Sequence, residues 1–364
     1  MDLFLTLFYI LLLVLALLIS GFGWSNKLKR LNAPFSWFFI YVTSILIGFR
    51  SRYSGVDTTA YYEYFNNVYH RIEPKFTFEP GFTFLTNIFT EISNVEIYIF
   101  FLSSSQLIFL YLSSKTLKID NKLLSLVLFL SFVPGFDLIT NGLRGGVALS
   151  LGLILLVATV INHNRLAILN FSPALIHASY MIIAFISLFT KFFSSQKMNK
   201  FIFICSLIFF ALWLVVSPLS FMGVFQGTSR EVNSVGRLIR YLIIEKELMS
   251  LTVKLYFMLL SIFLSSIYFF ALKFNEKAKD DNILTRMAFI TLSVQFVYAL
   301  FSFSEYSYRF MFLAFPLQVL MFSYILDKYF SGTIRSLIVF SVCLLGIIST
   351  YSTKTFSSFI LLDL

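Results

Sequence analysis

Long apolar stretches, separated by short polar connectors, follow one another along almost the whole chain. A transmembrane helix needs about 20 apolar residues, and a stretch of about 17 can still cross a bilayer. The pattern therefore predicts an all-α polytopic membrane protein with a single membrane-embedded domain over residues 1–364. The predicted spans lie near residues 3–24, 34–49, 95–114, 122–138, 143–161, 201–219, 252–273, 285–303, 308–327 and 334–351.

Two further segments have apolar patterns that do not fit a simple span. Residues 79–93 are short and amphipathic, which is typical of a helix lying in the membrane interface. Residues 165–190 contain a Ser-Pro pair, and they predict a hairpin of two short helices, 165–177 and 178–190, that meet at an outward corner at His177. With these segments the chain is expected to have about 12 membrane helices and both ends outside.

Composition supports a membrane protein and excludes several other classes. Of the 364 residues, 58% are hydrophobic and 13% are charged, whereas soluble domains carry about 25% charged residues. The two cysteines lie in apolar runs, so we expect no disulfide framework and no metal cluster. No cofactor is expected either. The net charge of +10 does not indicate nucleic-acid binding, because basic residues in a membrane protein set topology or meet lipid phosphates.

Lysines and arginines separate by side of the membrane under this topology. Lysines predominate in the inner connectors, as the positive-inside rule prefers, whereas arginines gather on the outside. Headgroup contact explains a single arginine, but lysine would serve that purpose equally well. A guanidinium is planar and binds phosphate through two nitrogens, so the set predicts an anion site at the outer boundary. Its candidate ligands are Arg50, Arg52, Arg144, Arg230, Arg237, Arg240 and Arg309.

Arg144 is the most informative of these arginines. It follows Asn141 closely at the start of a predicted helix, and Gly145 and Gly146 come directly after it. A cation at a helix N-terminus is unfavourable unless an anion lies nearby, whereas free N–H groups there attract anions. The alternative is a helix cap, with the glycines serving close helix packing.

Three outward residues are candidates for acid–base chemistry, each with a structural alternative. His177, one of three histidines, would act as a base, a phosphate donor or an orienting group, unless it is a satisfied structural residue. Asp57 follows a glycine closely and would otherwise form a turn, and Glu79 precedes Pro-Gly and would otherwise cap a helix. A base beside a set of cations supplies what group transfer with a phosphate leaving group needs.

Four short motifs occur in order on these outward segments. They are Arg50 with Gly55-Val-Asp57 and Tyr61, then Glu79-Pro-Gly-Phe, then Asn141-x-x-Arg144 with Ala148, and then His177-Ala-Ser. Together they resemble the EpsG-like branch of the Wzy polysaccharide (O-antigen) polymerases. The resemblance covers about residues 50–180, and beyond them it extends only to hydropathy and an outward Arg-rich loop. The family usually has Arg-Gln-Gly where this chain has Arg144-Gly145-Gly146.

The resemblance implies a multi-pass glycosyltransferase of the bacterial inner (cytoplasmic) membrane whose active site faces the periplasm or exterior. Such an enzyme joins oligosaccharide repeat units carried on undecaprenyl pyrophosphate, as in lipopolysaccharide biosynthesis, and needs neither metal nor nucleotide. The growing chain moves to the non-reducing-end hydroxyl of the next unit. Lipid-linked donor and acceptor are the implied partners, together with the bilayer and a chain-length regulator.

The resemblance also implies roles for the candidate residues. The outward loops 50–94 and 220–251 would form the catalytic face, with the seven arginines named above binding pyrophosphate. His177, Asp57 and Glu79 would be catalytic, and Tyr61, Asn141 and Tyr308 would bind sugar.

Two other functions remain open at this point. A flippase or transporter of lipid-linked oligosaccharide would place cations along a path through the bundle, whereas here they lie near the two faces. An O-antigen ligase would release the same undecaprenyl pyrophosphate while using a different acceptor. The residues alone do not separate a ligase from a polymerase.

Overall fold

The computed structural model of the chain describes residues 2–22, 26–50, 57–73, 78–162, 167–215, 251–302 and 307–352. Over these residues the chain is helical apart from short turns, and none of them forms a β-strand. Eight of the described helices are long and apolar enough to cross a membrane. The predicted all-α polytopic membrane architecture is therefore confirmed.

The chain divides into two compact units, which are residues 1–184 with 323–364, and residues 185–322. The first unit contains α1 (Asp2–Phe22), α2 (Asn26–Gly48), α3 (Thr58–Tyr69), α4 (Pro80–Ile92), α5 (Val95–Thr116), α6 (Lys122–Ser131), α7 (Val133–Thr140), α8 (Leu143–Ile161), the 3-10 helices η1 (Ala167–Leu175) and η2 (Ala178–Tyr180), and α17 (Gly332–Ser352). The second unit contains α10 (Gln196–Val215), α13 (Leu251–Phe274), α14 (Glu276–Lys279) and α15 (Asn282–Leu300). Two helices, α9 (Met181–Phe193) and α16 (Ser307–Tyr329), run from one unit into the other.

The membrane-length helices can be counted only over the residues that the structure describes. Within the described ranges, eight helices are long and apolar enough to cross a membrane, or nine if the bent pair α6–α7 counts as one span. Two shorter apolar helices cover Tyr9–Gly21 and Ala178–Phe193. The predicted count of about twelve is not confirmed.

The predicted span near residues 122–138 is bent. Helices α6 and α7 meet at an angle of 89°, and Phe132 between them has an extended backbone (φ −112°, ψ 148°). Pro134 lies in the first turn of α7, a position that tolerates its missing N–H group, whereas the interior of one continuous helix would not. The bend turns the C-terminal end of α7 toward Arg50, which donates a hydrogen bond to the carbonyl of Thr140.

The predicted hairpin at 165–190 has its break at His177, whose backbone is extended (φ −151°, ψ 115°). The segment before the break is the 3-10 helix η1 instead of an α-helix, and it contains Pro173, which has no N–H to donate to an α-helical ladder. The segment after the break begins as η2 and continues as α9.

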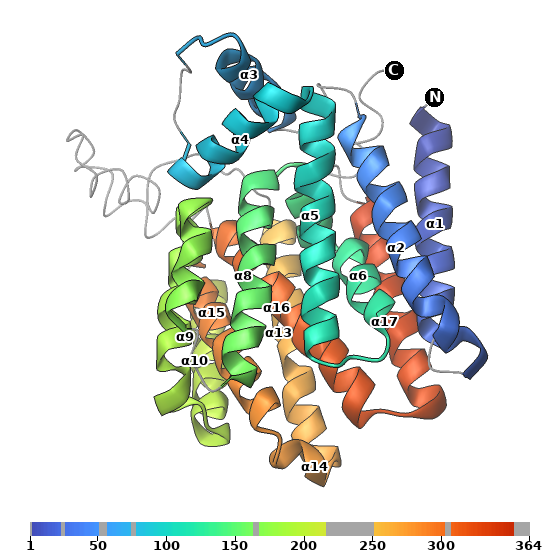
Figure 1. Cartoon of the computed structure of the whole chain (residues 1–364). Coiled ribbons are helices and arrows are strands. Elements are labelled where there is room, and N and C mark those ends of the chain that lie inside the picture. Colours follow the sequence, from blue (N-terminus) through green and yellow to red (C-terminus); the bar gives the residue numbers. More distant parts are fainter. Residues whose placement is uncertain are drawn as a thin grey trace, which may run out of the picture. The chain divides into compact units, whose positions relative to one another are not determined.

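Helices α3 and α4 lie across the end of α5 at which α5 begins, and the three helices are in contact (Figure 1). Helix α4 agrees with the helix expected at 79–93. Its exposed apolar residues Phe84, Ile88 and Ile92 recur every four positions and so share one face. Whether this face lies in a membrane interface stays a prediction. Helix α3 falls within the segment expected as an outward loop.

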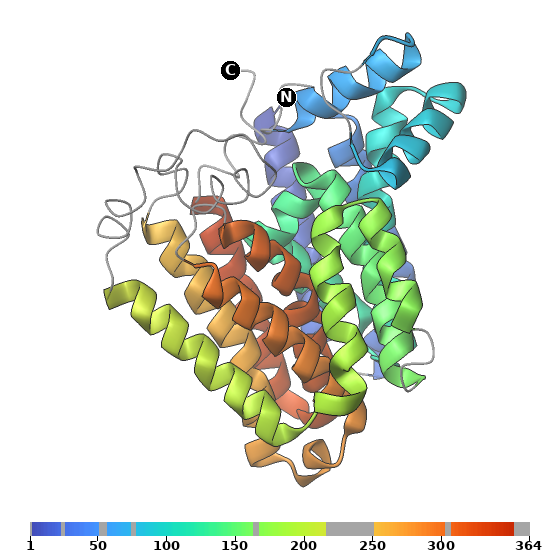
Figure 2. The same cartoon turned by 90° about the vertical axis from the view of Figure 1, so that its left-hand side faces the viewer.

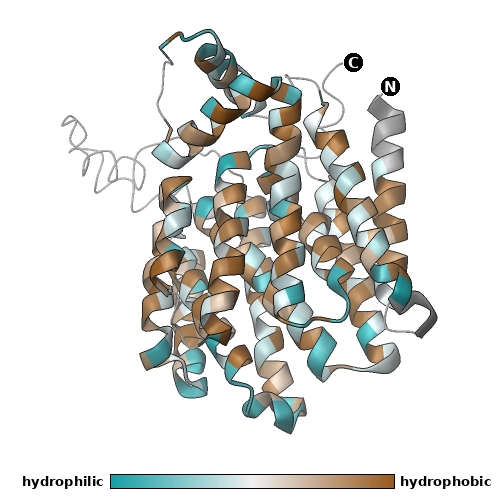
Figure 3. Ribbon diagram, in the orientation of Figure 1, coloured by the Kyte–Doolittle hydropathy of each residue, from teal (hydrophilic) through white to brown (hydrophobic). Residues whose placement is uncertain are grey.

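The core of the first unit is the packing of α8 against α5 and the 3-10 segment. A Cβ atom on Gly146 would lie 2.0 Å from Gln106 Oε1, and one on Gly152 would lie 2.0 Å from the ring of Tyr180. These glycines therefore allow close approach. Hydrophobic residues predominate along α5 and α8 (Figure 3), and in the second unit α10 and α13 both pack against α15 (Figure 2).

Candidate functional site

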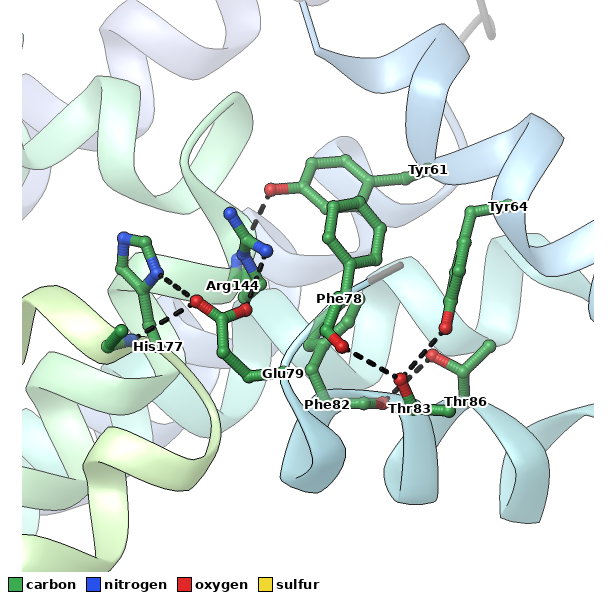
Figure 4. A network of polar contacts seen from close by, with 10 residues as sticks. Tyr61, Tyr64, Phe78, Glu79, Phe82, Thr83, Thr86, Arg144 and His177 are labelled. Carbon is green, nitrogen blue, oxygen red and sulfur yellow. Dashed lines mark hydrogen bonds and ion pairs between the residues drawn. The ribbon is translucent and has the colours of Figure 1, made fainter. Parts of the chain in front are cut away.

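The side chain of Glu79 joins three elements of the first unit. Its Oε2 accepts a hydrogen bond from Arg144 Nη1 at 2.6 Å. Its Oε1 accepts one from the backbone N–H of Ala178 at 3.1 Å and lies 3.2 Å from Nδ1 of His177. Figure 4 shows the carboxylate between the guanidinium and the imidazole. One carboxylate thus connects α4, the first turn of α8 and the His177 corner.

Local sequence explains why Glu79 is held in this position. A residue before proline favours extended backbone, and Glu79, which precedes Pro80, has φ −60° and ψ 150°. The hydroxyl of Thr83, one turn into α4, donates to the carbonyl of Phe78 at 3.4 Å and shares a hydrogen bond with the hydroxyl of Tyr64 at 2.9 Å. The chain is therefore fixed on both sides of Glu79 (Figure 4).

One edge of the Arg144 guanidinium bonds to Glu79, and the other edge makes no hydrogen bond to a described residue. Its Nη1 bonds to Glu79, and its guanidinium carbon lies 4.4 Å from the centroid of the Phe78 ring, a cation–π contact. Its backbone N–H points to the hydroxyl of Tyr61 at 3.4 Å. Within the described ranges, Nε and Nη2 of Arg144 make no hydrogen bond, and the side chain is 24% exposed. The free edge can therefore bind an anion.

His177 is oriented in a similar way. An ionised carboxylate only accepts hydrogen bonds, so the proton of the neutral ring belongs on Nδ1, which faces Glu79. Its Nε2 makes no hydrogen bond to any described residue and is then an acceptor. The ring lies against Gly145, where a Cβ atom would come within 3.0 Å of Cδ2 and 3.4 Å of Nε2.

The surroundings of Glu79 keep it ionised. Burial by itself would raise the pKa of this carboxyl, but the hydrogen bonds from His177 and Ala178 and the charge of Arg144 lower the pKa to about 2. A carboxylate with so low a pKa is a weak base at neutral pH. The contacts instead suit Glu79 to orienting the imidazole and the guanidinium.

Arg50 links three elements beside this group. Its Nη2 donates to the hydroxyl of Thr58 at the start of α3 and to the carbonyl of Thr140 at the end of α7. Burial lowers the pKa of this guanidinium to about 9, against the opposing influence of nearby Tyr62, Tyr61 and Asp137. A cation that bonds the last carbonyls of a helix is favourable. Arg50 therefore fixes the ends of α2, α3 and α7 relative to one another.

The sequence reasoning missed Asp137, a partly exposed carboxylate on α7. Its Oδ1 accepts a hydrogen bond from Nδ2 of Asn141 at 2.7 Å, and its charge interacts with those of Arg50 and Asp57. A carboxylate inside an otherwise apolar predicted span is a functional candidate by default. That signal was present in the sequence.

The structure brings most of the described candidates together and leaves several outside. His177, Glu79, Arg144 and Tyr61 form one group, and Arg50 and Asn141 lie beside it. Asp57 is exposed at the N-cap of α3 and interacts electrostatically with Tyr61. The remaining candidates are Arg309, which is exposed in the second unit, and Arg52, Arg230, Arg237, Arg240 and the side chain of Tyr308, which lie outside the described residues.

Potential metal ligands do not form a cluster in the part of the chain that the structure describes. Within it, no three His, Cys, Asp or Glu residues are arranged to hold a metal ion. The chemistry of the described group is that of a carboxylate, a guanidinium and an imidazole.

Comparison with known proteins gives one match. A sequence model described as the EpsG family matches residues 35–360, which is most of the chain and includes every residue of the described group. No curated protein and no solved structure matches the chain. The chain therefore belongs to the EpsG family, which indicates a glycosyltransferase-type polymerase of polysaccharide biosynthesis.

Proposed function

We propose that the protein is a polymerase that joins oligosaccharide repeat units carried on undecaprenyl pyrophosphate. It transfers the growing chain from its lipid carrier to the non-reducing-end hydroxyl of the next unit. The reaction takes place at the outer face of the bacterial inner membrane and needs neither nucleotide nor metal. Membership of the EpsG family supports the class of reaction, and the group around Glu79 supports the chemistry.

The observation that carries the proposal is that Glu79 bonds Arg144 and His177 at the same time, through its two oxygens. The carboxylate leaves an acceptor atom, Nε2 of His177, and a donor edge, Nε and Nη2 of Arg144, for substrates. A proton acceptor and a phosphate ligand held in one rigid arrangement are what a glycosyl transfer with a pyrophosphate leaving group requires.

The step follows from these atoms. Nε2 of His177 accepts the proton of the acceptor hydroxyl while its oxygen forms a bond to the anomeric carbon of the donor chain. The bond between that carbon and the pyrophosphate oxygen breaks, and its electron pair leaves with undecaprenyl pyrophosphate. The free edge of Arg144 binds the charge that develops on the leaving oxygens. Glu79 stabilises the positive charge on the imidazole.

Among the described arginines of the first unit, Arg144 is the one that we assign to pyrophosphate. Nη2 of Arg50 already bonds two neighbouring elements, so a role in holding the site together explains its contacts. Tyr61 is buried, with its hydroxyl 3.4 Å from the backbone nitrogen of Arg144, and its predicted role in sugar binding stays part of the proposal. The predicted roles of Arg52, Arg230, Arg237, Arg240, Arg309 and Tyr308 stay part of the proposal.

Deletion of the gene in the source bacterium tests the proposal. Single repeat units on their lipid carrier should accumulate on the outer face, and long polymer should disappear. Wild-type protein should restore the polymer and Arg144→Lys should not. Accumulation on the inner face would instead indicate a flippase, and long polymer that stays on its lipid carrier would indicate a ligase.

A further inference from the structure

A second polar pair lies at the C-terminal end of α7. Asn141 is the C-cap residue of α7 and is only 7% exposed, and its Nδ2 donates to Oδ1 of Asp137 at 2.7 Å. The backbone N–H groups of Asn141 and Gly142 both donate to the carbonyl of Asp137, at 2.8 and 2.9 Å. The two side chains are therefore held in a fixed relation.

The direction of the Asn141 amide follows from its partner. An ionised carboxylate cannot donate a hydrogen bond, so the nitrogen of the amide must face Asp137 and the oxygen must face away. That oxygen, Oδ1 of Asn141, is fully buried and has no hydrogen-bond partner among the described residues. A buried amide oxygen is rarely left without a partner in a native protein.

Asp137 offers a second open acceptor. Its Oδ2 takes no hydrogen bond within the described ranges, and its side chain is partly exposed. Two acceptors that lack donors call for a ligand with donors. A phosphate offers only acceptors and carries negative charge, and a metal cation is disfavoured by Arg50, whose charge already interacts with Asp137. Hydroxyl groups satisfy both acceptors.

We propose that Asp137 and Asn141 bind hydroxyl groups of the sugar attached directly to the pyrophosphate of the lipid-linked substrate. This inference rests on the proposed function and names the part of the substrate that the pair recognises. Asn141 is the residue directly after α7, and Arg144 is the second residue of α8, with Gly142 and Leu143 between them. A ligand with its pyrophosphate on Arg144 therefore presents its first sugar to the pair.

Binding of two lipids to purified protein in lipid nanodiscs tests this assignment. One lipid is undecaprenyl pyrophosphate without sugar, and the other is the lipid-linked repeat unit extracted from cells that lack the protein. Asn141→Leu and Asp137→Asn should each weaken binding of the repeat unit about tenfold and change binding of the sugar-free lipid by less than about twofold. Arg144→Lys should weaken both.

Matched controls keep the result interpretable. Asn87→Leu on α4 removes an exposed amide that makes no described side-chain hydrogen bond, and it should leave both affinities unchanged. If Asn141→Leu does not fold, Asp137→Asn decides, because an amide of the same size preserves the contact with Asn141. Equal weakening of both lipids, or weakening of neither, would overturn the inference. Loss of repeat-unit binding on adding a chelator would overturn it in favour of a cation.

The two proposals fail differently in this experiment. Wild-type protein that binds neither lipid would contradict the proposed function itself, together with this inference. Wild-type protein that binds both, with variants of the pair that do not discriminate between them, would contradict only the sugar-binding role.

Discussion

Glu79 and Arg144, 65 positions apart in the sequence, form an ion pair with 2.6 Å between Oε2 and Nη1. The pair compensates a cation in the first turn of α8, which the helix dipole alone would disfavour. Because only one edge of the guanidinium is used, the compensation does not block anion binding. The same carboxylate aligns His177, so the geometry of cation and imidazole depends on one side chain.

Replacing Glu79 with glutamine should remove both effects while keeping the shape of the side chain. We expect polymer formation by Glu79→Gln to fall about 10- to 100-fold, because the imidazole loses its charged partner. The measurement is the rate of polymer formation by each variant and by wild type at equal protein level. Glu91→Gln on the same helix, an exposed residue, is the matched control and should behave as wild type. Equal activity of the two variants would rule out the orienting role.

Arg144→Lys keeps the positive charge and loses the planar fork. We expect at least a tenfold loss of activity together with weaker binding of undecaprenyl pyrophosphate, because lysine binds phosphate as a point charge. Arg71→Lys makes the same exchange at an exposed arginine beside α3 and should have no effect. A fully active Arg144→Lys variant would mean that Arg144 is not the phosphate ligand.

Acid should remove a contribution of Glu79 to stability. The pKa of Glu79 in the folded protein is about 2, below the ordinary carboxyl value near 4.3. The shift corresponds to about 3 kcal/mol, which solvent screening of this partly exposed group reduces to roughly 2 kcal/mol. This stability is fully present above about pH 4.3 and is lost as the pH falls toward 2. In detergent, the melting temperature of wild type should exceed that of Glu79→Gln at pH 6, and the difference should shrink below about pH 4. A difference that stays constant with pH would contradict this contribution.

Gly145 should be sensitive because His177 lies against it. A Cβ atom there would sit 3.0 Å from the imidazole and force it to shift by a few tenths of an ångström. We expect Gly145→Ala to lower activity about 3- to 10-fold with normal protein levels. Gly142→Ala is the control, because its Cβ would find its nearest neighbours at 3.5 Å, an ordinary contact. Identical activity of both variants would show that the ring position is not critical.

Much of the fold was accessible from the sequence because lipid-facing helices need long apolar runs. The helices expected near 95–114 and 143–161 occur as Val95–Thr116 and Leu143–Ile161. The bend at Phe132 was not predicted, although Pro134 follows it closely. Hydropathy shows that a segment is apolar but does not show where a helix changes direction. Helix α3 was missed because its sequence is polar and aromatic, and Tyr61, Tyr64 and Phe65 find their burial only by tertiary packing.

Part of the candidate site was also accessible from the sequence. Outward loops were expected to converge, and Glu79, Arg144, His177 and Tyr61 do meet in the structure. Their pairing could not be read from the sequence, because the contacts join positions 65 and 98 apart. Asp137 was overlooked because it fell inside a predicted span, where its charge was the informative feature.

Reconstituted protein supplied with the lipid-linked repeat unit provides the most direct test of the central claim. The measurement is the chain length of the product together with the amount of undecaprenyl pyrophosphate released. Wild type should release one carrier for each linkage formed, and His177→Gln and Arg144→Lys should each slow both quantities by at least about tenfold. Chain growth at the wild-type rate in both variants would contradict the assignment of the reaction to the group around Glu79.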